Sequence, residues 1–433
     1  LAHAAVGLTD TIMLGWYSVE TLAAGALANS IFFTLFVVGS GFAQAVMPMV
    51  ASAASANDPQ QIRRITRMGL WLSLLTAACL MPIMWWCKPI LELLRQDPEI
   101  ASLTQTYMRI AGWSLFPALL VMVFRSYLAA QERAQVIFWI TVLGGIGNAL
   151  ANWVLIFGKW GFPELGIAGA AIATLLNQLL VLAGLCFYAL RALPELALLQ
   201  RMWRPDWEAF REVYRLGWPI GLTQLAESGL FTGTAIMMGW LGTLQLAAHG
   251  IAMQITSTVF MIHIGLSLAG TVRASRAFGV GDVAGLLRGG QVAFMLSLSL
   301  IALTMVLFLT VPEALLVLFL DPNEPNRADV IALGVGLMAM AALFQLADGT
   351  QVMALGLLRG CQDTRTPMVM AAISYWAIGI PAGYILGFWT PLAQIGVWAG
   401  LVAGLFCASG LLLHRFWVRR DWQNQLPPAP TSV

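Results

Sequence analysis

The stretch Ile12-Met13-Leu14-Gly15-Trp16 occurs a second time, nearly unchanged, as Ile236-Met237-Met238-Gly239-Trp240. The two copies start at residues 12 and 236, and the same spacing carries Asp58 onto Asp282. Both copies lie in long apolar segments. The sequence therefore predicts a duplicated bundle of membrane helices, which is the plan of a secondary transporter with two lobes around a central path.

Composition supports the membrane assignment independently. Of the 433 residues, 59% are hydrophobic and only 10% are charged, and the mean hydropathy is +0.79. Lipid cannot satisfy backbone polar groups, so long apolar runs in a bilayer must be helices of about 20 residues. The predicted fold is an all-α integral membrane protein with about twelve transmembrane helices in two pseudo-symmetric six-helix lobes. The expected spans centre on residues 1–16, 22–50, 64–86, 101–128, 135–157, 165–190, 216–240, 244–275, 288–315, 331–358, 366–388 and 394–418.

The first span, residues 1–16, is shorter than a bilayer requires and has no initiator Met. We expect this helix to be truncated at its N-terminus, with a missing start of roughly 10–30 residues.

The domain prediction has three parts: an N-lobe over residues 1–192, a cytosolic linker over 193–215, and a C-lobe with a cytosolic tail over 216–433. Within the linker, Trp207 and two further aromatic residues recur at helical spacing opposite charged residues, which predicts an interfacial amphipathic helix. A plain connector is the preferred interpretation of this helix, and membrane sensing is the alternative.

The distribution of basic residues predicts the topology. Nearly all arginines fall on one side of a twelve-helix arrangement, whereas Lys88, Arg95, Lys159 and Arg327 fall on the other. By the positive-inside rule, both termini and the linker are expected in the cytosol.

Three acids lie well away from the ends of predicted spans, namely Asp10, Glu227 and Asp348. An ionisable group at the centre of a membrane helix costs at least ~2.5 kcal/mol and usually serves a function. The alternative is a structural ion pair, but we expect no basic residue at the depth of these acids.

In the N-lobe, Asn148 and Asn152 are four residues apart on one helical face. Asp10 is expected ~10 Å deep, and Asn148 and Thr174 ~14 Å deep on adjacent antiparallel helices. One carboxylate with neutral oxygens at similar depth predicts a pocket for a proton or a small monovalent cation such as Na⁺. Taken alone, the two asparagines could instead be residues that hydrogen-bond neighbouring helices together.

In the C-lobe, Glu227 and Asp348 are both expected ~15 Å from the inner face. Two carboxylates in one apolar cavity repel each other, so at least one should hold a proton near neutral pH. Gln224 and Gln345 lie one turn away and could bind substrate or tune these acids, and Pro219 is the preferred hinge.

These residues occur in strings that resemble the multidrug and toxic compound extrusion family, and within it the NorM-type branch. The resemblance covers nearly the whole chain. Its strings are Thr9-Asp10-Thr11-Ile12-Met13, Asn148-Ala149-Leu150-Ala151-Asn152, Gly217-Trp218-Pro219-Ile220-Gly221 leading to Glu227, and Ala347-Asp348 followed by Leu358-Arg359-Gly360.

The resemblance implies a secondary active multidrug efflux antiporter that exports amphipathic, often cationic drugs in exchange for Na⁺, H⁺ or both, by alternating access. It implies a cation or proton site at Asp10, Asn148, Asn152 and Thr174. It also implies a second cation, proton or substrate site at Glu227 and Asp348. Some relatives carry an acid where Asn152 stands, which leaves the choice of ion open.

Two other functions remain as alternatives. A lipid-linked oligosaccharide flippase should show basic residues in its cavity, and only Arg109 is a candidate. A membrane-embedded enzyme needs clustered acids or paired His and Glu, and the four histidines show no such spacing. We expect no cofactor beyond the coupling ion, no ATP because no P-loop pattern is present, and no nucleic acid. We expect a monomer in the bacterial inner membrane, with drugs and the lipid bilayer as its partners.

Overall fold

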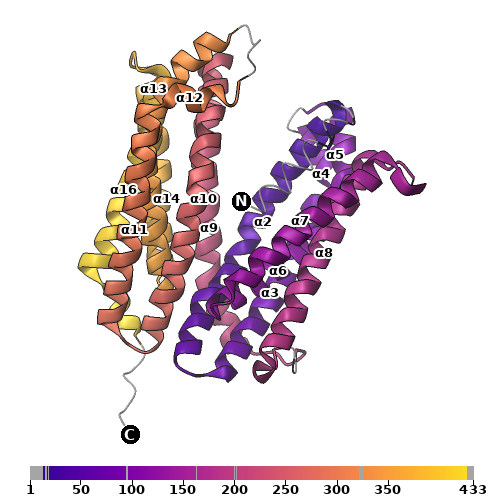
Figure 1. The fold of residues 1–433 in the computed structure, drawn as a ribbon, viewed down its shortest axis with the longest axis vertical. Coiled ribbons are helices and arrows are strands. Elements are labelled where there is room, and N and C mark those ends of the chain that lie inside the picture. Colours follow the sequence, from indigo (N-terminus) through magenta and orange to yellow (C-terminus); the bar gives the residue numbers. More distant parts are fainter. Residues whose placement is uncertain are drawn as a thin grey trace. The chain divides into compact units, whose positions relative to one another are not determined.

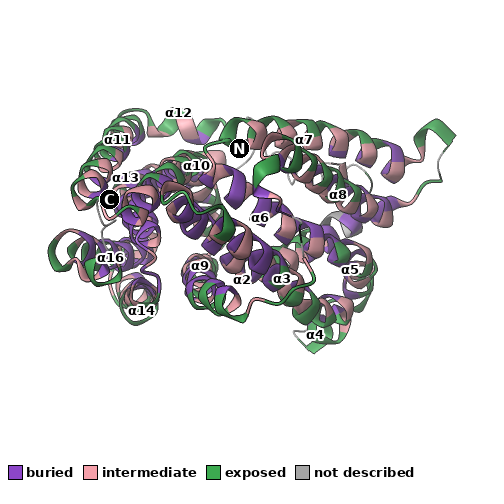
Figure 2. Ribbon diagram, turned by 90° about the horizontal axis from the view of Figure 1, so that it is seen from below, coloured by how far each residue is buried: buried purple, intermediate pink, exposed green. Residues whose placement is uncertain are grey.

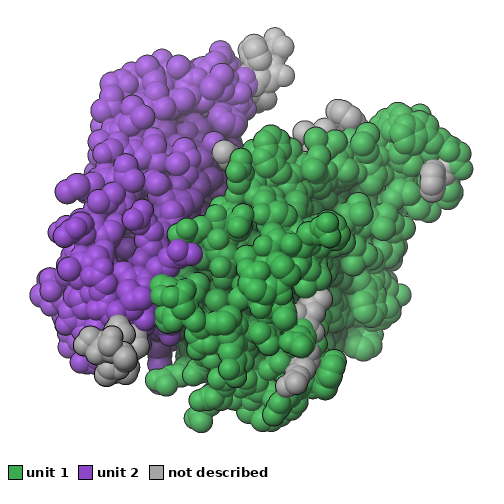
Figure 3. All heavy atoms as spheres, turned by 60° about the horizontal axis from the view of Figure 1, so that its bottom comes forward, with its two compact units in different colours: residues 1–221 green, residues 222–433 purple. Residues whose placement is uncertain are grey.

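The computed structural model describes residues 13–14, 17, 19–93, 96–161, 163–198, 200, 202–320 and 326–426, and every regular element in these ranges is a helix (Figure 1). The chain separates into two compact units, Leu1–Gly221 and Leu222–Val433, which Figure 3 colours separately. The predicted boundaries at 192 and 216 stay a prediction. Asp10, with most of the predicted first span, and Arg95 lie outside the described residues.

The first unit is a bundle of membrane-length helices with short connecting turns. Its helices are α2 (Val19–Ser55), α3 (Pro59–Trp85), α4 (Cys87–Leu93), α5 (Pro98–Ala111), α6 (Leu115–Ala130), α7 (Ala134–Phe157) and α8 (Gly166–Ala192). Helix α2 packs against α3, α5 and α6, and α7 packs against α8. The short helical turn η1 (Gly112–Ser114) joins α5 to α6, so the two form one membrane-length span.

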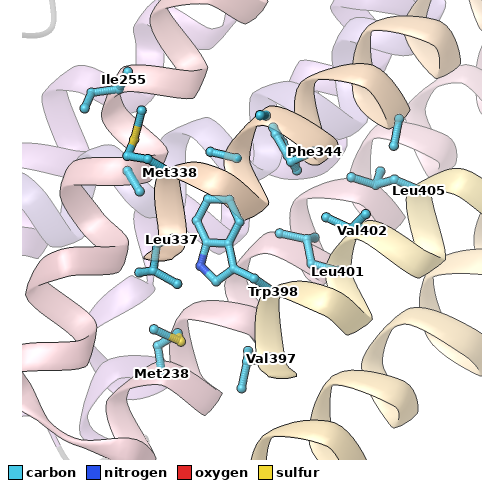
Figure 4. Packing of buried hydrophobic residues seen from close by; sticks show 14 of the residues in the cluster. Met238, Ile255, Leu337, Met338, Phe344, Val397, Trp398, Leu401, Val402 and Leu405 are labelled. Atoms are coloured by element: carbon cyan, nitrogen blue, oxygen red, sulfur yellow. The ribbon is translucent and has the colours of Figure 1, made fainter. Parts of the chain in front are cut away.

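The second unit repeats this plan. Helix α9 (Trp207–Leu241) crosses the boundary between the units, and it is followed by α10 (Thr243–Gly279), α11 (Val283–Thr310), α12 (Pro312–Val317), α13 (Arg327–Gly360), α14 (Arg365–Ile373), α15 (Ile380–Phe388) and α16 (Ala393–His414). The π-helical turn η4 (Ser374–Gly379) joins α14 to α15. Helix α13 lies against α10, α11 and α16, and the core there includes the fully buried Trp398 (Figure 4).

The fold-class prediction is confirmed: the chain is an all-helical, multi-pass membrane protein. Ten helical segments of the described chain are long and apolar enough to cross a bilayer, and they match ten of the twelve predicted spans. The other two are the first span and the span 216–240. The latter lies within the 35 residues of α9, where Gln224 and Glu227 reduce the hydropathy.

Burial along the helices has the pattern of a membrane protein (Figure 2). On α7 the buried residues include the amides Asn148 and Asn152, whereas Trp139, Leu143 and Leu150 on the same helix are exposed. Apolar residues thus face outward and polar ones inward. In water this arrangement would be unfavourable, but in lipid it removes the polar groups from hydrocarbon.

The sequence repeat has a structural meaning at the helix ends. Asp58 accepts a hydrogen bond from the backbone N–H of Gln61 (2.9 Å) and caps α3. Its counterpart Asp282 accepts one from the N–H of Gly285 (2.8 Å) and caps α11. Each aspartate follows the longest helix of its unit, so the duplicated residue starts the corresponding helix in both halves.

Closely packed glycines explain tight contacts between helices. A Cβ atom on Gly41 of α2 would lie 2.6 Å from the carbonyl oxygen of Gly217 in α9. A Cβ atom on Gly360 of α13 would lie 2.9 Å from the carbonyl oxygen of Thr271 in α10. Glycine at these positions therefore permits the close approach of helices that membrane packing requires.

The amphipathic segment over residues 207–214 does not form the separate interfacial helix that the sequence predicts. Residues 207–214 form the first turns of α9, which continues without a break to Leu241. The amphipathic pattern of Trp207, Phe210 and Tyr214 therefore belongs to the end of a membrane-length helix. Pro219 lies inside this helix, and its role as a hinge stays a prediction.

Candidate functional site

The N-lobe candidates are placed on two neighbouring helices. Asn148 and Asn152 are 1% and 0% exposed on α7, and Thr174 is half-buried on α8, where its hydroxyl donates to the Ala170 carbonyl (3.0 Å). Helix α7 packs against α8, so the two amides and the hydroxyl belong to adjacent helices. Asp10 lies outside the described residues, so its place beside them stays a prediction.

A further amide, Asn177, was missed in the sequence. It is 7% exposed on α8, one turn beyond Thr174. A Cβ atom on Gly144 of α7 would lie 2.9 Å from its Oδ1, so Asn177 packs against α7 one turn before Asn148. Among the described residues no donor reaches this oxygen. The available signal was the spacing of three from Thr174, which places both side chains on one helical face.

A buried glutamine contacts one of the two C-lobe acids. Gln351 lies on α13 one turn after Asp348 and is fully buried, and its Nε2 donates to Oε1 of Glu227 on α9 (3.1 Å). Asp348 is 1% exposed, and in the described part of the chain its Oδ1 has no hydrogen-bond donor. Asp348 and Glu227 are close enough to interact electrostatically. The structure therefore brings the two predicted acids together.

Two more ionisable residues lie within electrostatic range of one or both of these acids. Tyr375 on the π-helical turn η4 is fully buried and interacts electrostatically with Glu227 and Asp348. Arg359, near the end of α13, interacts electrostatically with Glu227. Arg359 interacts with Glu227 from a position about three turns beyond Asp348 on α13, so the expectation that no basic residue lies at the depth of these acids stays a prediction. Helix α13 is long enough to carry Asp348 and, about three turns later, Arg359, whose long side chain extends the reach of its charge.

The glutamines differ in what they contact. Gln345 is fully buried, and its Nε2 donates to the Thr256 carbonyl of α10 (3.0 Å), which joins α13 to α10. Gln224 is half-buried on α9, one turn before Glu227. The tuning roles of Gln224 and Gln345 stay predictions. Gln351 contacts an acid directly, and it was missed although its spacing of three from Asp348 was visible in the sequence.

The buried histidines have packing contacts. The Nδ1 atom of His249 accepts a hydrogen bond from the indole N–H of Trp398 (3.1 Å), and Nδ1 of His263 lies 3.0 Å from the Ser297 hydroxyl. In the described residues no three His, Cys, Asp or Glu side chains gather as they would around a transition metal. The polar groups of the two candidate sites are carboxylates and amides, which suit protons and hard monovalent cations.

A helical membrane protein that buries carboxylates and amides inside its bundles, with a sequence repeat between its halves, has the architecture typical of a membrane transporter. A family model described as MatE matches residues 1–154 and 219–385. The chain belongs to the MatE family. It is therefore a membrane transporter and not an enzyme.

Similar proteins support this membership. A protein of Rhizobium meliloti named "Probable multidrug resistance protein NorM" is 45% identical over 420 residues, which cover 96% of this chain and 90% of that protein. A protein of the same name from Synechocystis sp. is 35% identical over 431 residues, covering 99% of this chain and 94% of that protein. The expected NorM-type resemblance is confirmed.

Solved structures agree on the fold. "Crystal structure of MATE in complex with MaL6" superposes with a TM-score of 0.86 at 20% identity, covering 98% of this chain and 94% of that chain. "Outward-facing conformation of a multidrug resistance MATE family transporter of the MOP superfamily" gives a TM-score of 0.85 at 19% identity, covering 99% of this chain and 93% of that chain.

Proposed function

We propose that the chain is a secondary active multidrug efflux antiporter, which exports amphipathic, often cationic drugs in exchange for H⁺, Na⁺ or both by alternating access. The observation that carries the proposal is the carboxylate pair of the second unit. Asp348 is almost fully buried, has an oxygen without a donor among the described residues, and interacts with Glu227. The names of the relatives, which refer to multidrug resistance, support the substrate class.

The charges around the pair explain why it would exchange one cation for another. Two ionised carboxylates against the single guanidinium of Arg359 leave one negative charge in an apolar interior. A proton, a Na⁺ ion or a cationic drug can neutralise this charge, and a second cation would then add an unpaired positive charge. Entry of the coupling ion therefore favours release of a bound cationic drug.

The energy for export would come from the membrane potential and the ion gradient. One elementary charge moving down 100 mV supplies ~2.3 kcal/mol, so ATP is not required. We propose the inner membrane of a bacterium as the location, with both termini in the cytosol and a monomer as the working unit. The arginine distribution along the sequence supports this orientation.

For the first unit we propose a Na⁺ or H⁺ site formed by Asp10 with Asn148, Asn152 and Thr174. The burial of both amides on α7 supports it, since amide carbonyls can supply neutral oxygens to a cation. Asn177, on the same face of α8 as Thr174, is a further candidate ligand.

The experiment is dye efflux from proteoliposomes with Na⁺ and pH gradients imposed separately. Wild type should export a cationic dye when at least one inward gradient is present. The Asp348→Asn variant should insert normally and lose export, because a fixed neutral amide cannot alternate between ion and drug. The same rate in Asp348→Asn and wild type, or export without any gradient, would contradict the proposal.

A further inference from the structure

The residues between α8 and α9, 193–206, form a connecting segment. A basic cleft lies where this connecting segment meets the start of α3 in the first unit. Its volume is about 610 Å³. The charged side chains that line it are Arg63, Arg64, Arg67, Arg204, Asp206 and Glu208. Four arginines against two carboxylates leave two positive charges at this cleft.

The two carboxylates are already occupied by one arginine. Arg64 donates to both oxygens of Asp206 (2.5 and 3.0 Å) and to Glu208 (2.6 Å). Arg67 is nearly buried, and its Nη2 lies 3.8 Å from an Asp206 oxygen. The acidic side chains therefore neutralise the inner part of the cleft, while the charges of the other two arginines are left for a ligand.

Arg63 and Arg204 carry those remaining charges. The Nε of Arg63 donates to the Leu196 carbonyl (2.9 Å) and its Nη1 to Gln200 (3.4 Å), which fixes the guanidinium without cancelling its charge. Arg204 is exposed, and no carboxylate of the described chain lies within ion-pair distance of it. A guanidinium held by neutral acceptors beside a second, exposed one is a good receptor for a phosphate group.

The surroundings are those of a membrane boundary at the level of lipid headgroups. Trp203 and Trp207 are 80% and 73% exposed beside the cleft, and the indole N–H of Trp71 donates to the Met202 carbonyl (2.9 Å). Exposed tryptophans concentrate at membrane–water interfaces. Helix α3 leads from the cleft into the bilayer, since its membrane-length span begins at Pro59.

We propose that this cleft binds the phosphate-bearing headgroup of an anionic phospholipid. Arg63 and Arg204 donate to the phosphate oxygens, and the exposed tryptophans contact the glycerol and upper acyl chain. Basic pockets at the membrane boundary of a helical bundle bind anionic headgroups through the same chemistry. A bound lipid would hold the connecting segment against the start of α3.

The test is thermal unfolding of the full chain in a neutral detergent, with added phosphatidylglycerol, phosphatidylcholine or inorganic phosphate at constant ionic strength. A ligand that binds only the folded state raises the unfolding midpoint as its concentration rises. Phosphatidylglycerol should raise the midpoint of wild type in a saturable way, and phosphatidylcholine and inorganic phosphate should raise it much less. An equal effect of phosphatidylcholine or of inorganic phosphate would overturn the assignment.

Variants of the cleft arginines test whether phosphatidylglycerol acts at this cleft. The double variant Arg63→Gln/Arg204→Gln loses two charge-assisted contacts. It should therefore need a phosphatidylglycerol concentration about tenfold higher than wild type needs for the same midpoint shift. Arg204→Gln alone changes an exposed side chain, so it should leave the fold intact and show part of the loss. The matched control is Arg211→Gln/Arg215→Gln, which removes the same charge from exposed positions of α9 outside the cleft and should behave as wild type.

Two outcomes would overturn the proposal. Equal phosphatidylglycerol shifts in wild type and in all variants would show that the lipid acts elsewhere on the protein. No shift with phosphatidylglycerol, together with a saturable shift with an acidic peptide that Arg63→Gln/Arg204→Gln abolishes, would mean that the cleft serves a protein partner.

Discussion

At the scale of single residues, two buried glutamines on α13 have different hydrogen-bond partners. Gln351 donates to the carboxylate of Glu227, whereas Gln345 donates to a backbone carbonyl of α10. Both side chains are fully buried, so burial alone does not distinguish them. Their partners do: one side chain acts on an ionisable group and the other joins two helices.

Replacing Gln351 should therefore change the pH dependence of transport. Gln351→Leu removes the donor to Glu227 and so disfavours the ionised carboxylate, and the midpoint of the pH profile should move to higher pH. Gln345→Leu is the matched control. It leaves the Thr256 carbonyl without that donor, which should lower stability by about 1–3 kcal/mol while the pH midpoint stays in place. The measurements are dye efflux against pH and thermal unfolding. A shift of the pH midpoint in Gln345→Leu and not in Gln351→Leu would reverse these assignments.

The buried amides of α7 lead to a prediction about ion dependence. Asn148→Ala and Asn152→Ala each remove a neutral oxygen donor from the proposed Na⁺ site. Each should raise the Na⁺ concentration for half-maximal efflux by roughly tenfold, the effect of about 1.4 kcal/mol. Efflux driven by a pH gradient alone serves as the internal control and should change less. If wild-type efflux does not respond to Na⁺, Asp10 is a proton carrier and the amides only hydrogen-bond to it.

At the scale of helices, small residues decide which helices can touch. In α16, a Cβ atom on Gly400 would overlap the backbone of Gly383, whereas a Cβ atom on Gly410 would meet nothing within 4 Å. The π-helical turn η4 lies just before Pro381, whose missing N–H interrupts the helical hydrogen bonds at this point. Close glycine packing therefore holds the irregular segment that carries Tyr375 against α16.

Two alanine substitutions on α16 test this packing. Gly400→Ala should destabilise the protein by about 1–3 kcal/mol, because the added methyl group forces the helices apart. Gly410→Ala adds the same methyl group in open space and should be neutral or stabilise by up to about 1 kcal/mol through helix propensity. Thermal unfolding of both variants in the same detergent gives the comparison. Equal stability of the two would mean that α15 and α16 are not packed as described.

The junction of α3 with α9 should respond to acid. Asp206 has a pKa below its usual range, because Arg64 donates hydrogen bonds to the carboxylate. A carboxylate whose pKa is lower in the folded state adds stability above its ordinary pKa, near 3.8. This contribution is lost as the pH falls from that value through the pKa of the folded state.

Asp206→Asn should therefore lower stability at neutral pH and lose less on acidification to about pH 3 than wild type does. The asparagine oxygen can still accept the hydrogen bond that Asp206 accepts from the Ala209 N–H (3.1 Å), so the start of α9 stays capped. Glu208→Gln is a suitable control, since Glu208 contacts the same arginine but its side chain is 74% exposed, and such pairs contribute little. An identical acid response in wild type and Asp206→Asn would show that this ion pair does not stabilise the junction.

At the scale of the whole molecule, the sequence alone determined the duplication, the helical membrane class and most spans, because hydropathy and length are local properties of the chain. It also identified Glu227 and Asp348, since a carboxylate in an apolar helix is visible without coordinates. Only the tertiary structure decided that Gln351 hydrogen-bonds Glu227, that Tyr375 interacts electrostatically with both acids, and that Arg359 does so with Glu227. Such partners come from different helices or from another turn of one helix. Their meeting depends on which helix faces pack together, and that is set by the whole bundle rather than by the residues nearest in the chain.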